Sequence, residues 1–442
     1  MYILFKDSAL SLVSRFFVLG AAVLTSVLIS RTLGASLQGT YNVFVLIANT
    51  ATVIFSLSAS VASIILGARE PEHLPQLLGN ALLMALAASA ISVVTLLLLL
   101  QIPAVQIYLL DNGVEELLMV GILLMVPIIM LSSFLREIIR AAGQITLYNI
   151  IMALPYLLNF VFLLAAIFLQ PGMLNAVVVG WMATQIITTL LTITLAWRSA
   201  GFRLGVDIKL LRFSLGYGAR SHLGIVTHLL NYRLDVFLIG VFLPTDFIGY
   251  YTIATLYAER IWEFPSAIRT ALLYHASANI TDAPQITAQT TRISMLFVTL
   301  ATVGLVLISY PFITLVHGEA FQPAVLPLII LMPGVWMLSL GKLLGVYIAS
   351  VNRPEIGTYA GVISLFFTLI LDLWLIPLIG IPGAALASSV AYSISTLIIA
   401  SYFLRMTHLS WIDVSLIRRS DIDLLRRALI RIVRPPVHPS KG

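Results

Sequence analysis

The feature that most constrains this chain is a succession of long apolar runs, each about as long as a bilayer-spanning helix. A helix needs roughly 20 mostly apolar residues to cross the hydrocarbon core. Because 60% of the residues are hydrophobic and only 10% are charged, the chain could not cover itself with polar surface in water. We therefore predict an all-α integral membrane protein with about 12 transmembrane helices. The runs lie at about residues 8–30, 40–66, 76–101, 115–137, 147–169, 174–197, 214–243, 247–273, 288–315, 323–350, 355–378 and 382–404.

The positions of Lys and Arg predict the orientation. Short cytoplasmic loops carry an excess of these residues. If the N-terminus is cytoplasmic, the inside segments hold eighteen Lys and Arg, and the outside loops hold one, Arg31. We therefore expect a multi-pass protein of the cell membrane with both termini cytoplasmic. The outside loops are short, the longest running from about 102 to 115, which argues against a membrane glycosyltransferase or polymerase with an outer catalytic site.

Residues 405–442 form a basic tail that supplies most of the net charge of +6. We expect its stretch 421–434, preceded by Ser420 as a cap, to be an interfacial helix on anionic lipid, with a partner-docking helix as the alternative. Nucleic-acid binding is not expected. The chain has no cysteine, so it has no disulfide or thiolate metal site. No cleavable signal peptide is expected, and the first run is predicted to remain as a helix.

An internal repeat divides the chain. Gly39 and Tyr41 recur as Gly249 and Tyr251 at an offset of 210, and Pro171-Gly172 recurs as Pro382-Gly383 at 211. Two lobes of six helices follow, at 1–205 and 206–404. Because six is even, both lobes have the same orientation and should flank a cleft. We expect the glycine to permit a tight helix entry and the tyrosine to place its hydroxyl among the headgroups.

Basic side chains within the apolar runs are costly, so they mark functional positions. The candidates for a substrate-binding cavity are Arg15, Arg233, Arg260 and Lys342. Some of them have a structural alternative, because Arg15 can snorkel to the interface and Arg233 can pair with an acid of the next helix. A cavity with excess positive charge suits an anionic headgroup such as a diphosphate, which Arg binds bidentately.

The acids within the runs are Asp235, Glu259, Glu263 and Asp372, and they are candidates for ion pairing or for coupling to H⁺ or Na⁺. Glu259 and Glu263 are one helical turn apart and are expected to line a water-filled cavity. Their pairing with Arg233 would instead only fix helix packing. Asp372 has no charged neighbour in sequence, which suits a neutral, proton-carrying carboxyl group.

Motifs of soluble enzymes are missing from the sequence. Gly341-Lys342 resembles the end of a phosphate-binding loop, but Trp336 stands where that loop needs its first glycine. We therefore expect no enzyme activity, no cofactor and no metal, and any energy must come from a gradient or from substrate flux.

Three segments, in this order, resemble the Wzx-type polysaccharide flippases of the multidrug/oligosaccharidyl-lipid/polysaccharide (MOP) exporter superfamily. They are Arg31-Thr-Leu-Gly34 with Gly39-x-Tyr41, then Asn231-Tyr-Arg233-Leu-Asp235 with Gly249-Tyr-Tyr251 and Pro265, and finally Leu375 to Ala385. Carried over by position, Arg31, Arg233 and Asp235 are the motif residues, and Arg31 is added to the cavity candidates. Tyr274-His275 departs from the family pattern of Pro followed by a basic residue, which puts a role for that turn in doubt.

The resemblance implies two six-helix lobes around a central cavity. It also implies movement of an undecaprenyl-diphosphate-linked oligosaccharide from the inner to the outer leaflet, by alternating access, for O-antigen or exopolysaccharide synthesis. A polysaccharide polymerase and glycosyltransferases would be partners. The alternatives are a cation-coupled multidrug exporter, which Glu259 and Glu263 favour, and a lipid II flippase, which usually has two further helices.

Overall fold

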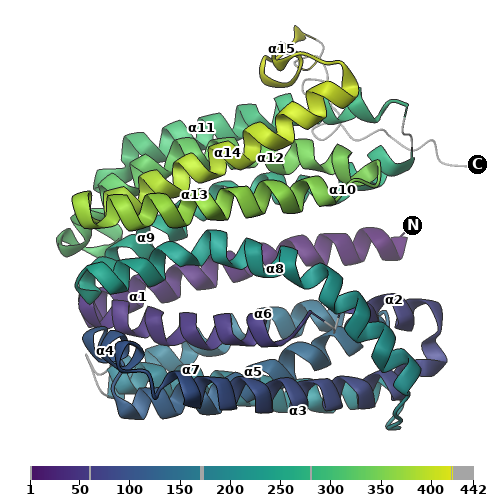
Figure 1. Ribbon diagram of the computed structural model, residues 1–442, viewed down its shortest axis with the longest axis vertical. Coiled ribbons are helices and arrows are strands. Elements are labelled where there is room, and N and C mark those ends of the chain that lie inside the picture. The colour runs from purple at the N-terminus through teal and green to yellow at the C-terminus, as the bar shows by residue number, and fades with distance from the viewer. Residues whose placement is uncertain (1, 59–60, 170–173, 279–280, 420, 422–442) are drawn as a thin grey trace, which may run out of the picture. The chain divides into compact units, whose positions relative to one another are not determined.

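The computed structural model describes residues 2–58, 61–169, 174–278, 281–419 and 421, and within these ranges it holds helices and no strand (Figure 1). The all-α prediction is confirmed. The elements in chain order are α1 (Tyr2–Phe55), α2 (Val61–Arg69), the 3-10 helix η1 (Pro71–His73), α3 (Leu74–Leu99), α4 (Pro103–Asp111), α5 (Glu116–Ala141), α6 (Ile145–Leu169), α7 (Leu174–Ser199), α8 (Ile208–Phe242), α9 (Thr245–Ile261), α10 (Glu263–Ala278), α11 (Ala283–His317), the 3-10 helix η2 (Glu319–Ala324), α12 (Val325–Ser350), α13 (Glu355–Ile379), α14 (Ile381–Thr407) and α15 (Trp411–Ser415).

Ten helices of the described chain are long and apolar enough to cross a membrane. Two features account for the difference from the twelve apolar runs. The first two runs join into α1, which kinks at Gly34, where φ is 73° and ψ is −178°. This combination of φ and ψ is not helical and requires glycine, so two helices meet at a kink within α1. The run at 247–273 is divided between α9 and α10, neither of which spans alone.

The run at 40–66 was predicted as one helix, and that prediction is wrong. Helix α1 ends at Phe55 and α2 begins at Val61, with Leu57 and Ser58 at positive φ between them. A helix end inside a membrane leaves carbonyl groups that need partners. His222 of α8 supplies one, because its Nε2 lies 2.9 Å from the Ile54 carbonyl oxygen and its Nδ1 lies 3.1 Å from Ser58 Oγ.

The run at 247–273 is also broken, at Trp262, between α9 and α10. Pro265 has no N–H to donate to the carbonyl of Ile261, which ends the first helix. The hydroxyl of Ser266 instead donates to the Trp262 carbonyl at 2.8 Å. The two broken runs are each the second run of a predicted six-helix half.

The residues fall into two compact units, each described by itself. Unit 1 comprises 1–253, 311–325 and 372–384, and unit 2 comprises 254–310, 326–371 and 385–442. The predicted boundary between lobes at residue 205 stays a prediction. In unit 1, α5 packs between α3 and α7, and α6 packs against α1 and α7 (Figure 1). The rings of Phe44 and Trp181 meet edge to face there, with centroids 5.4 Å apart.

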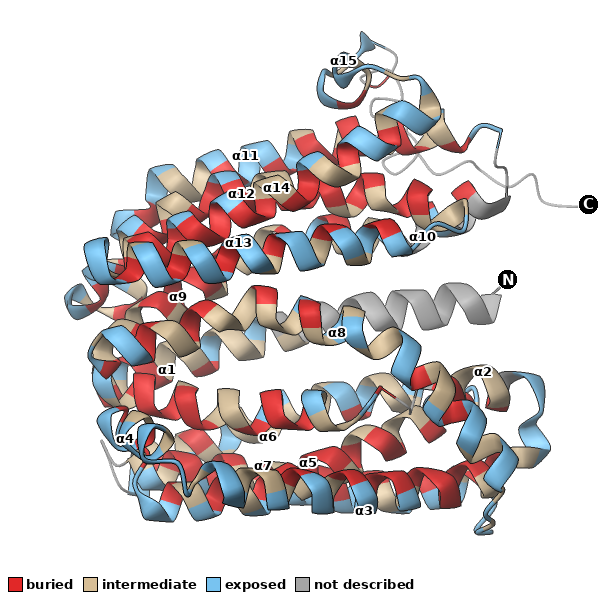
Figure 2. Cartoon of the chain, viewed as in Figure 1, coloured by how far each residue is buried: buried red, intermediate tan, exposed pale blue. Residues whose placement is uncertain are grey.

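Unit 2 is built on close contact between α12 and α14, whose facing sides are buried (Figure 2). Gly334 lies directly against Ser389 of α14, and Gly341 lies against Thr396. Small residues at these positions let the two backbones approach, as is usual between membrane helices. The core around them includes the edge-to-face pair Tyr347 and Phe403, 5.3 Å apart.

The segment after α14 folds back onto unit 2, which the sequence did not predict. Val414 is fully buried in the core of this unit. Asp421 is fully buried and accepts hydrogen bonds from Arg292 of α11 at 2.6 and 2.9 Å. Arg292 also donates to the carbonyl of Asp413. The predicted interfacial helix at 421–434 lies outside the described residues, apart from Asp421.

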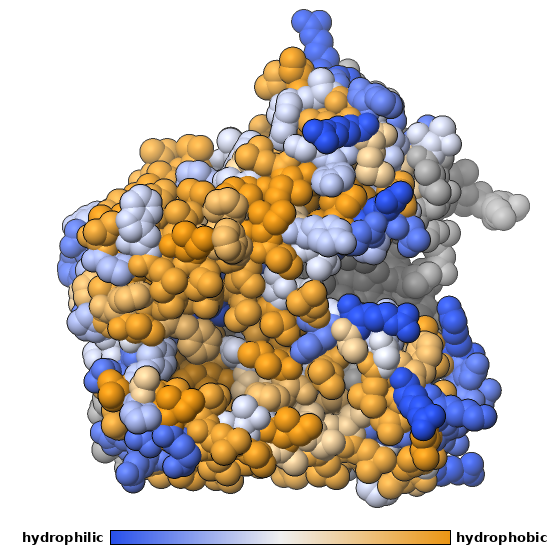
Figure 3. All heavy atoms as spheres, in the orientation of Figure 1, coloured by the Kyte–Doolittle hydropathy of each residue, from blue (hydrophilic) through white to orange (hydrophobic). Residues whose placement is uncertain are grey.

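The surface agrees with burial in lipid. Large apolar side chains are exposed along the helices, for example Leu86 at 66% and Phe168 at 82%. In the view of Figure 3, hydrophobic residues cover the middle of the helices and hydrophilic residues gather towards their ends. Water would not tolerate this pattern, whereas a bilayer requires it.

Tyr41 and Tyr251 do not lie among headgroups, so that expectation is wrong. Tyr41 is 7% exposed and Tyr251 is fully buried. The hydroxyl of Tyr41 is hydrogen-bonded to the side chain of Asn159, and that of Tyr251 donates to Asp235 at 2.5 Å. Each repeated tyrosine thus joins its helix to another helix of unit 1.

Candidate functional site

The predicted site residues divide between the two units. Unit 1 holds Arg31, Arg233, Asp235 and Asp372, and unit 2 holds Glu259, Arg260, Glu263 and Lys342. The side chain of Arg15 lies outside the described residues. Two groups of these residues bring charged side chains together within the helices. We name them the broken-helix cluster and the acid pair.

The broken-helix cluster consists of Glu259, Arg260, Trp262, Glu263 and Lys342, at the junction of α9 and α10. Arg260 lies in the last turn of α9 and Glu263 in the first turn of α10. The positive charge of Arg260 and the negative charge of Glu263 are both stabilised by the helix dipoles, which are negative at a C-terminus and positive at an N-terminus. Interrupted membrane helices in corresponding positions of two repeats commonly form the binding site of a transporter.

Lys342 of α12 completes the cluster. Its Nζ lies 4.1 Å from the centroid of the Trp262 ring, within the range of a cation–π contact. The carboxylates of Glu263 and Glu259 also act on it electrostatically. Trp262 is buried and meets Tyr392 of α14 edge to face at 6.2 Å. The ammonium group therefore contacts an aromatic ring and is attracted by two acids, while Arg269 repels it.

Arg260 brings a hydrogen-bond donor for which the described part of the chain supplies no acceptor. Its Nε is buried and has no hydrogen-bond partner in the structure. A buried donor without a partner is costly, so it favours an acceptor supplied by a ligand. Phosphate and carboxylate oxygens are the acceptors that match a guanidinium best.

The acid pair consists of Asp235 of α8 and Asp372 of α13, both in unit 1. Asp235 is 2% exposed, and its Oδ1 accepts the main-chain N–H of Val236 at 2.8 Å while its Oδ2 accepts the Tyr251 hydroxyl. Asp372 is fully buried, and neither of its carboxyl oxygens has a hydrogen-bond partner within the described ranges. Asp235 is the charged group that acts on Asp372. Two buried carboxylates that act on each other are unfavourable while both are charged. A bound proton or cation would remove this cost.

The motif arginines of unit 1 have structural contacts. Arg31 is exposed, and its Nε donates to the Val316 carbonyl at 2.8 Å while another guanidinium nitrogen donates to that of Leu315. It therefore caps the C-terminal end of α11. Arg233 is half-buried and donates to the carbonyl of Tyr232 at 3.1 Å. A role of either arginine in substrate binding stays a prediction.

The sequence did not predict the part that three aromatic residues play in these groups, although it identified one of them, Tyr251, as a repeat residue. Trp262 and Tyr392 line the broken-helix cluster, and Tyr251 binds Asp235. Pro265 three residues after Trp262 was a usable signal of a helix break, since proline removes a main-chain bond. No sequence signal connects Tyr392 with Trp262, because they are far apart in the chain.

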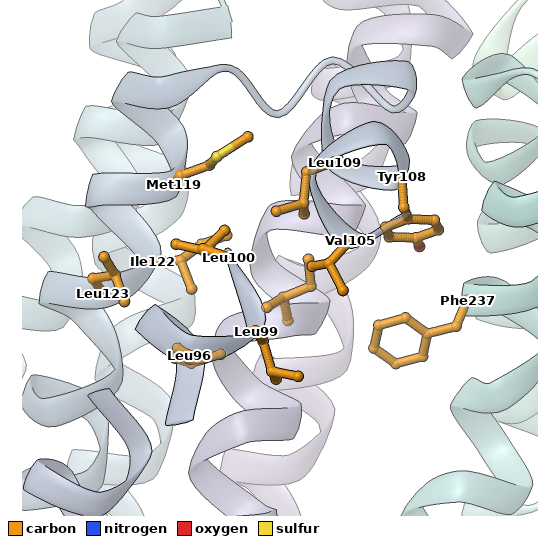
Figure 4. Close-up of a pocket in the computed structure, with 11 residues that line it drawn as sticks. Leu96, Leu99, Leu100, Val105, Tyr108, Leu109, Met119, Ile122, Leu123 and Phe237 are labelled. Atoms are coloured by element: carbon orange, nitrogen blue, oxygen red, sulfur yellow. The ribbon is translucent and has the colours of Figure 1, made fainter. Parts of the chain in front are cut away.

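A separate pocket of about 240 Å³ lies in unit 1 between the ends of α3 and α5, the short α4 and Phe237 of α8 (Figure 4). Its walls are apolar, apart from the hydroxyl of Tyr108. The pocket contains none of the predicted site residues. Because its walls are apolar, it suits a hydrocarbon chain and not a charged headgroup.

Comparisons with known proteins define the family. A family model described as "Polysaccharide biosynthesis protein" matches residues 28–326. The chain is also similar to the "Probable low-salt glycan biosynthesis flippase Agl15" of Haloferax volcanii (strain ATCC 29605), with 26% identity over 220 residues. That match covers 48% of this chain and 47% of the relative, so it spans about half the length of each.

Solved structures share the fold. A lipid II flippase MurJ in an inward closed conformation matches with a TM-score of 0.72 and 17% identity, over 98% of this chain and 94% of that one. An inward-facing MATE-family multidrug resistance transporter of the MOP superfamily matches with a TM-score of 0.66 and 14% identity, over 88% and 94%. The motif-based assignment is thereby confirmed. The chain belongs to the polysaccharide biosynthesis protein family and has the fold shared by transporters of the MOP superfamily.

Proposed function

We propose that this chain is a flippase. It moves an undecaprenyl-diphosphate-linked oligosaccharide from the inner to the outer leaflet of the cell membrane, for synthesis of a surface polysaccharide. The observation that carries the proposal is the broken-helix cluster, which places cationic donors and an aromatic wall inside a membrane protein of a polysaccharide family.

The chemistry of the cluster fits a diphosphate with attached sugars. Arg260 offers a buried donor without a partner, and Lys342 offers a mobile point charge. Glu263 and Glu259 balance Lys342 while the site is empty, which lowers the cost of keeping a cation in the membrane. Trp262 and Tyr392 supply apolar faces for a bulky, partly apolar ligand.

The acid pair provides the coupling in this proposal. No described residue is hydrogen-bonded to the Asp372 carboxyl group, so Asp372 is neutral and carries a proton, or it shares a bound Na⁺ with Asp235. Release of that ion would leave two buried carboxylates facing each other, which is unfavourable. A conformational change that rehydrates the pair would relieve this repulsion and could drive the return of the transporter.

The name of the Haloferax relative, a glycan biosynthesis flippase, supports a lipid-linked glycan as substrate. Glycosyltransferases that build the glycan and a polymerase that consumes it are the partners this function requires.

The test is export of lipid-linked glycan in cells that depend on this chain, with variants of the cluster. Lys342→Ala and Arg260→Ala should each reduce export about tenfold, because each removes a charged contact to phosphate, worth roughly 1.5–3 kcal/mol. Lipid-linked glycan should accumulate on the inner leaflet. Arg198→Ala, at the end of α7, is the matched control and should export normally. Normal export by both cluster variants, at normal membrane levels, would contradict the proposal.

A cation-coupled multidrug exporter is the second candidate. Glu259 and Glu263 beside the aromatic wall would suit a cationic drug, and the fold is shared with multidrug transporters. Drug resistance on overexpression, without any change in glycan export, would favour it. A lipid II flippase would instead be indicated if lipid II were the lipid that accumulated.

A further inference from the structure

The apolar pocket has no part in the proposed function, and its walls come from α1, α3, α4, α5 and α8 (Figure 4). The end of α3 and the beginning of α5 form two sides, and the short α4 forms a third. Phe237 of α8 and Ile47 of α1 complete the lining. Since all these residues belong to unit 1, the pocket lies within a single unit.

Helix α4 is what makes this part of unit 1 concave. Pro103 is the first residue of the helix, a position where the N–H that proline lacks is not needed. Val105, Tyr108 and Leu109 follow at i, i+3 and i+4, so they share one face, and all three line the pocket. Ile107, off this face, is exposed. The helix therefore closes the pocket with apolar side chains while exposing others to the surroundings.

The size and the walls of the pocket indicate what fills it. Its volume is about 240 Å³. An apolar cavity of about 150 Å³ in a soluble protein stays dry and binds benzene, and a buried water needs about three polar partners. The lining offers one polar group, so water is a poor occupant. A void would forfeit the dispersion contacts of every lining side chain. Hydrocarbon, the solvent of a membrane helix, is the occupant that fits.

The single polar group, the hydroxyl of Tyr108, adds a chemical requirement. Its oxygen is buried and has no hydrogen-bond partner among the described residues. It lies against α8 at Gly240, where a Cβ would be 2.9 Å from the hydroxyl oxygen. A buried tyrosine hydroxyl normally finds a partner. The occupant should therefore carry a hydrogen-bond acceptor next to its hydrocarbon.

We propose that the pocket is a binding site for one acyl chain of a membrane glycerophospholipid, whose ester carbonyl accepts a hydrogen bond from Tyr108. An ester carbonyl stands at the head end of each acyl chain of such a lipid. A polyprenyl chain fits less well, because it has no acceptor before its phosphates, and phosphates call for cations. None of the residues that line the pocket is charged.

The proposal does not depend on the transported substrate, because the pocket shares no residue with the broken-helix cluster or the acid pair. The segment 102–115 is predicted to be an outside loop, so we expect the lipid to come from the outer leaflet. A chain held there would join α4 to α5 and α8. It would therefore stabilise unit 1 and remain bound during purification.

Photolabelling tests the site in nanodiscs of dioleoyl phosphatidylglycerol that contain an analogue with a diazirine near the end of one acyl chain. Peptides covering 96–123 should be labelled more strongly than peptides covering 300–308, which carry the exposed Leu300 and Leu307. Leu123→Trp fills the pocket and should reduce this labelling about fivefold. Leu124→Trp, at the next and exposed residue, is the matched control and should leave labelling unchanged.

Two results of the photolabelling would overturn the proposal. Equal labelling of the wild type and Leu123→Trp would show that only lipid around the protein is detected. Loss of the label when undecaprenyl phosphate is added in an amount equal to the analogue would show that the pocket takes an isoprenoid chain instead. We expect undecaprenyl phosphate to have no effect at that ratio.

A second variant tests the acceptor without changing the shape of the pocket. Phospholipid retained after gel filtration in detergent is compared for an ester lipid and a diether lipid with the same chains, since an ether oxygen is the weaker acceptor. The wild type should retain roughly threefold more of the ester lipid, the effect of one neutral hydrogen bond. Tyr108→Phe should retain both equally, whereas Tyr359→Phe, at an exposed position, should keep the preference. Equal retention of the two lipids by the wild type would refute the proposal, whatever the glycan assays show.

Discussion

The broken-helix cluster and the acid pair each place two carboxyl groups inside the membrane. The neighbours of the first two carboxyl groups are cations, whereas those of the second two are not. Glu259 and Glu263 are half-buried beside Lys342 and Arg260. Asp235 and Asp372 are buried with a tyrosine, and the Asp372 carboxyl oxygens have no hydrogen-bond partner among the residues that the structure describes. Acids among cations can stay ionised, whereas acids without a cation must take one up.

This contrast suggests a division of labour. The broken-helix cluster keeps a nearly balanced charge and can bind an anionic group by rearranging its own ion pairs. The acid pair can change its charge by gaining or losing one ion, which suits coupling. Under the proposed function, carboxyl groups would serve binding in one region and energy conversion in the other, because the surrounding charges differ.

The largest expected effect comes from making the acid pair unable to titrate. Asp372→Asn keeps the shape of the side chain and removes its exchangeable charge, so coupled transport should fall at least about tenfold, the effect of roughly 1.4 kcal/mol. Ion-driven glycan transport into vesicles measures this. Asp111→Asn, at an exposed position, is the control. Coupled transport at the normal rate in Asp372→Asn would remove the acid pair from the coupling.

A smaller effect is expected from the acids of the broken-helix cluster. Glu259→Gln and Glu263→Gln release Lys342 from their attraction, so each should change glycan export only about twofold, as expected for a partly exposed ion pair. Transport assays with glycan and with cationic dyes decide the matter. If either variant abolished dye export and left glycan export intact, the multidrug alternative would gain and the contrast with the acid pair would disappear.

The smallest effect on transport is expected at a third buried acid, Asp421. The hydrogen-bonded Arg292 guanidinium lowers the pKa of Asp421 to about 2, so its stabilising contribution is present above the unfolded pKa of 3.8 and is lost as pH falls through about 2. Between pH 5 and 8 its charge is constant, unlike that proposed for Asp372. Arg292→Ala leaves the acid buried without its partner.

That change should lower the stability of the protein by about 3 kcal/mol, the usual cost of breaking a buried ion pair. Thermal unfolding in detergent measures this, and export should stay within about twofold of the wild type at a temperature where the variant is folded. A loss of export with unchanged stability would instead give the docked tail a direct part in transport.

The sequence predicted much of the fold and part of the site. Apolar runs located the membrane helices, and the repeat identified two glycines that lie against main chain of another helix, Gly39 against Thr245 and Gly249 against Ala35. The predicted acids Asp235 and Asp372 lie in the same unit, where the charge of Asp235 acts on Asp372. The sequence did not predict that Arg31 caps α11, that the repeated tyrosines are buried, or that two spanning runs are broken.

What the sequence determined by itself is local to each segment. Whether a run of residues prefers a bilayer depends on the transfer free energies of its own side chains, so composition and length are enough. The repeat and the family motifs are likewise readable along the chain.

What only the tertiary structure decided is which distant groups meet. The fit of Gly39 against Thr245, the interaction of Asp235 with Asp372 and the contact of Lys342 with the Trp262 ring arise between helices far apart in sequence. Inside a bilayer a charged or polar group is stabilised almost entirely by its protein neighbours, because no water is available. The chemistry of each membrane-buried charge is therefore set by packing, which no single segment encodes.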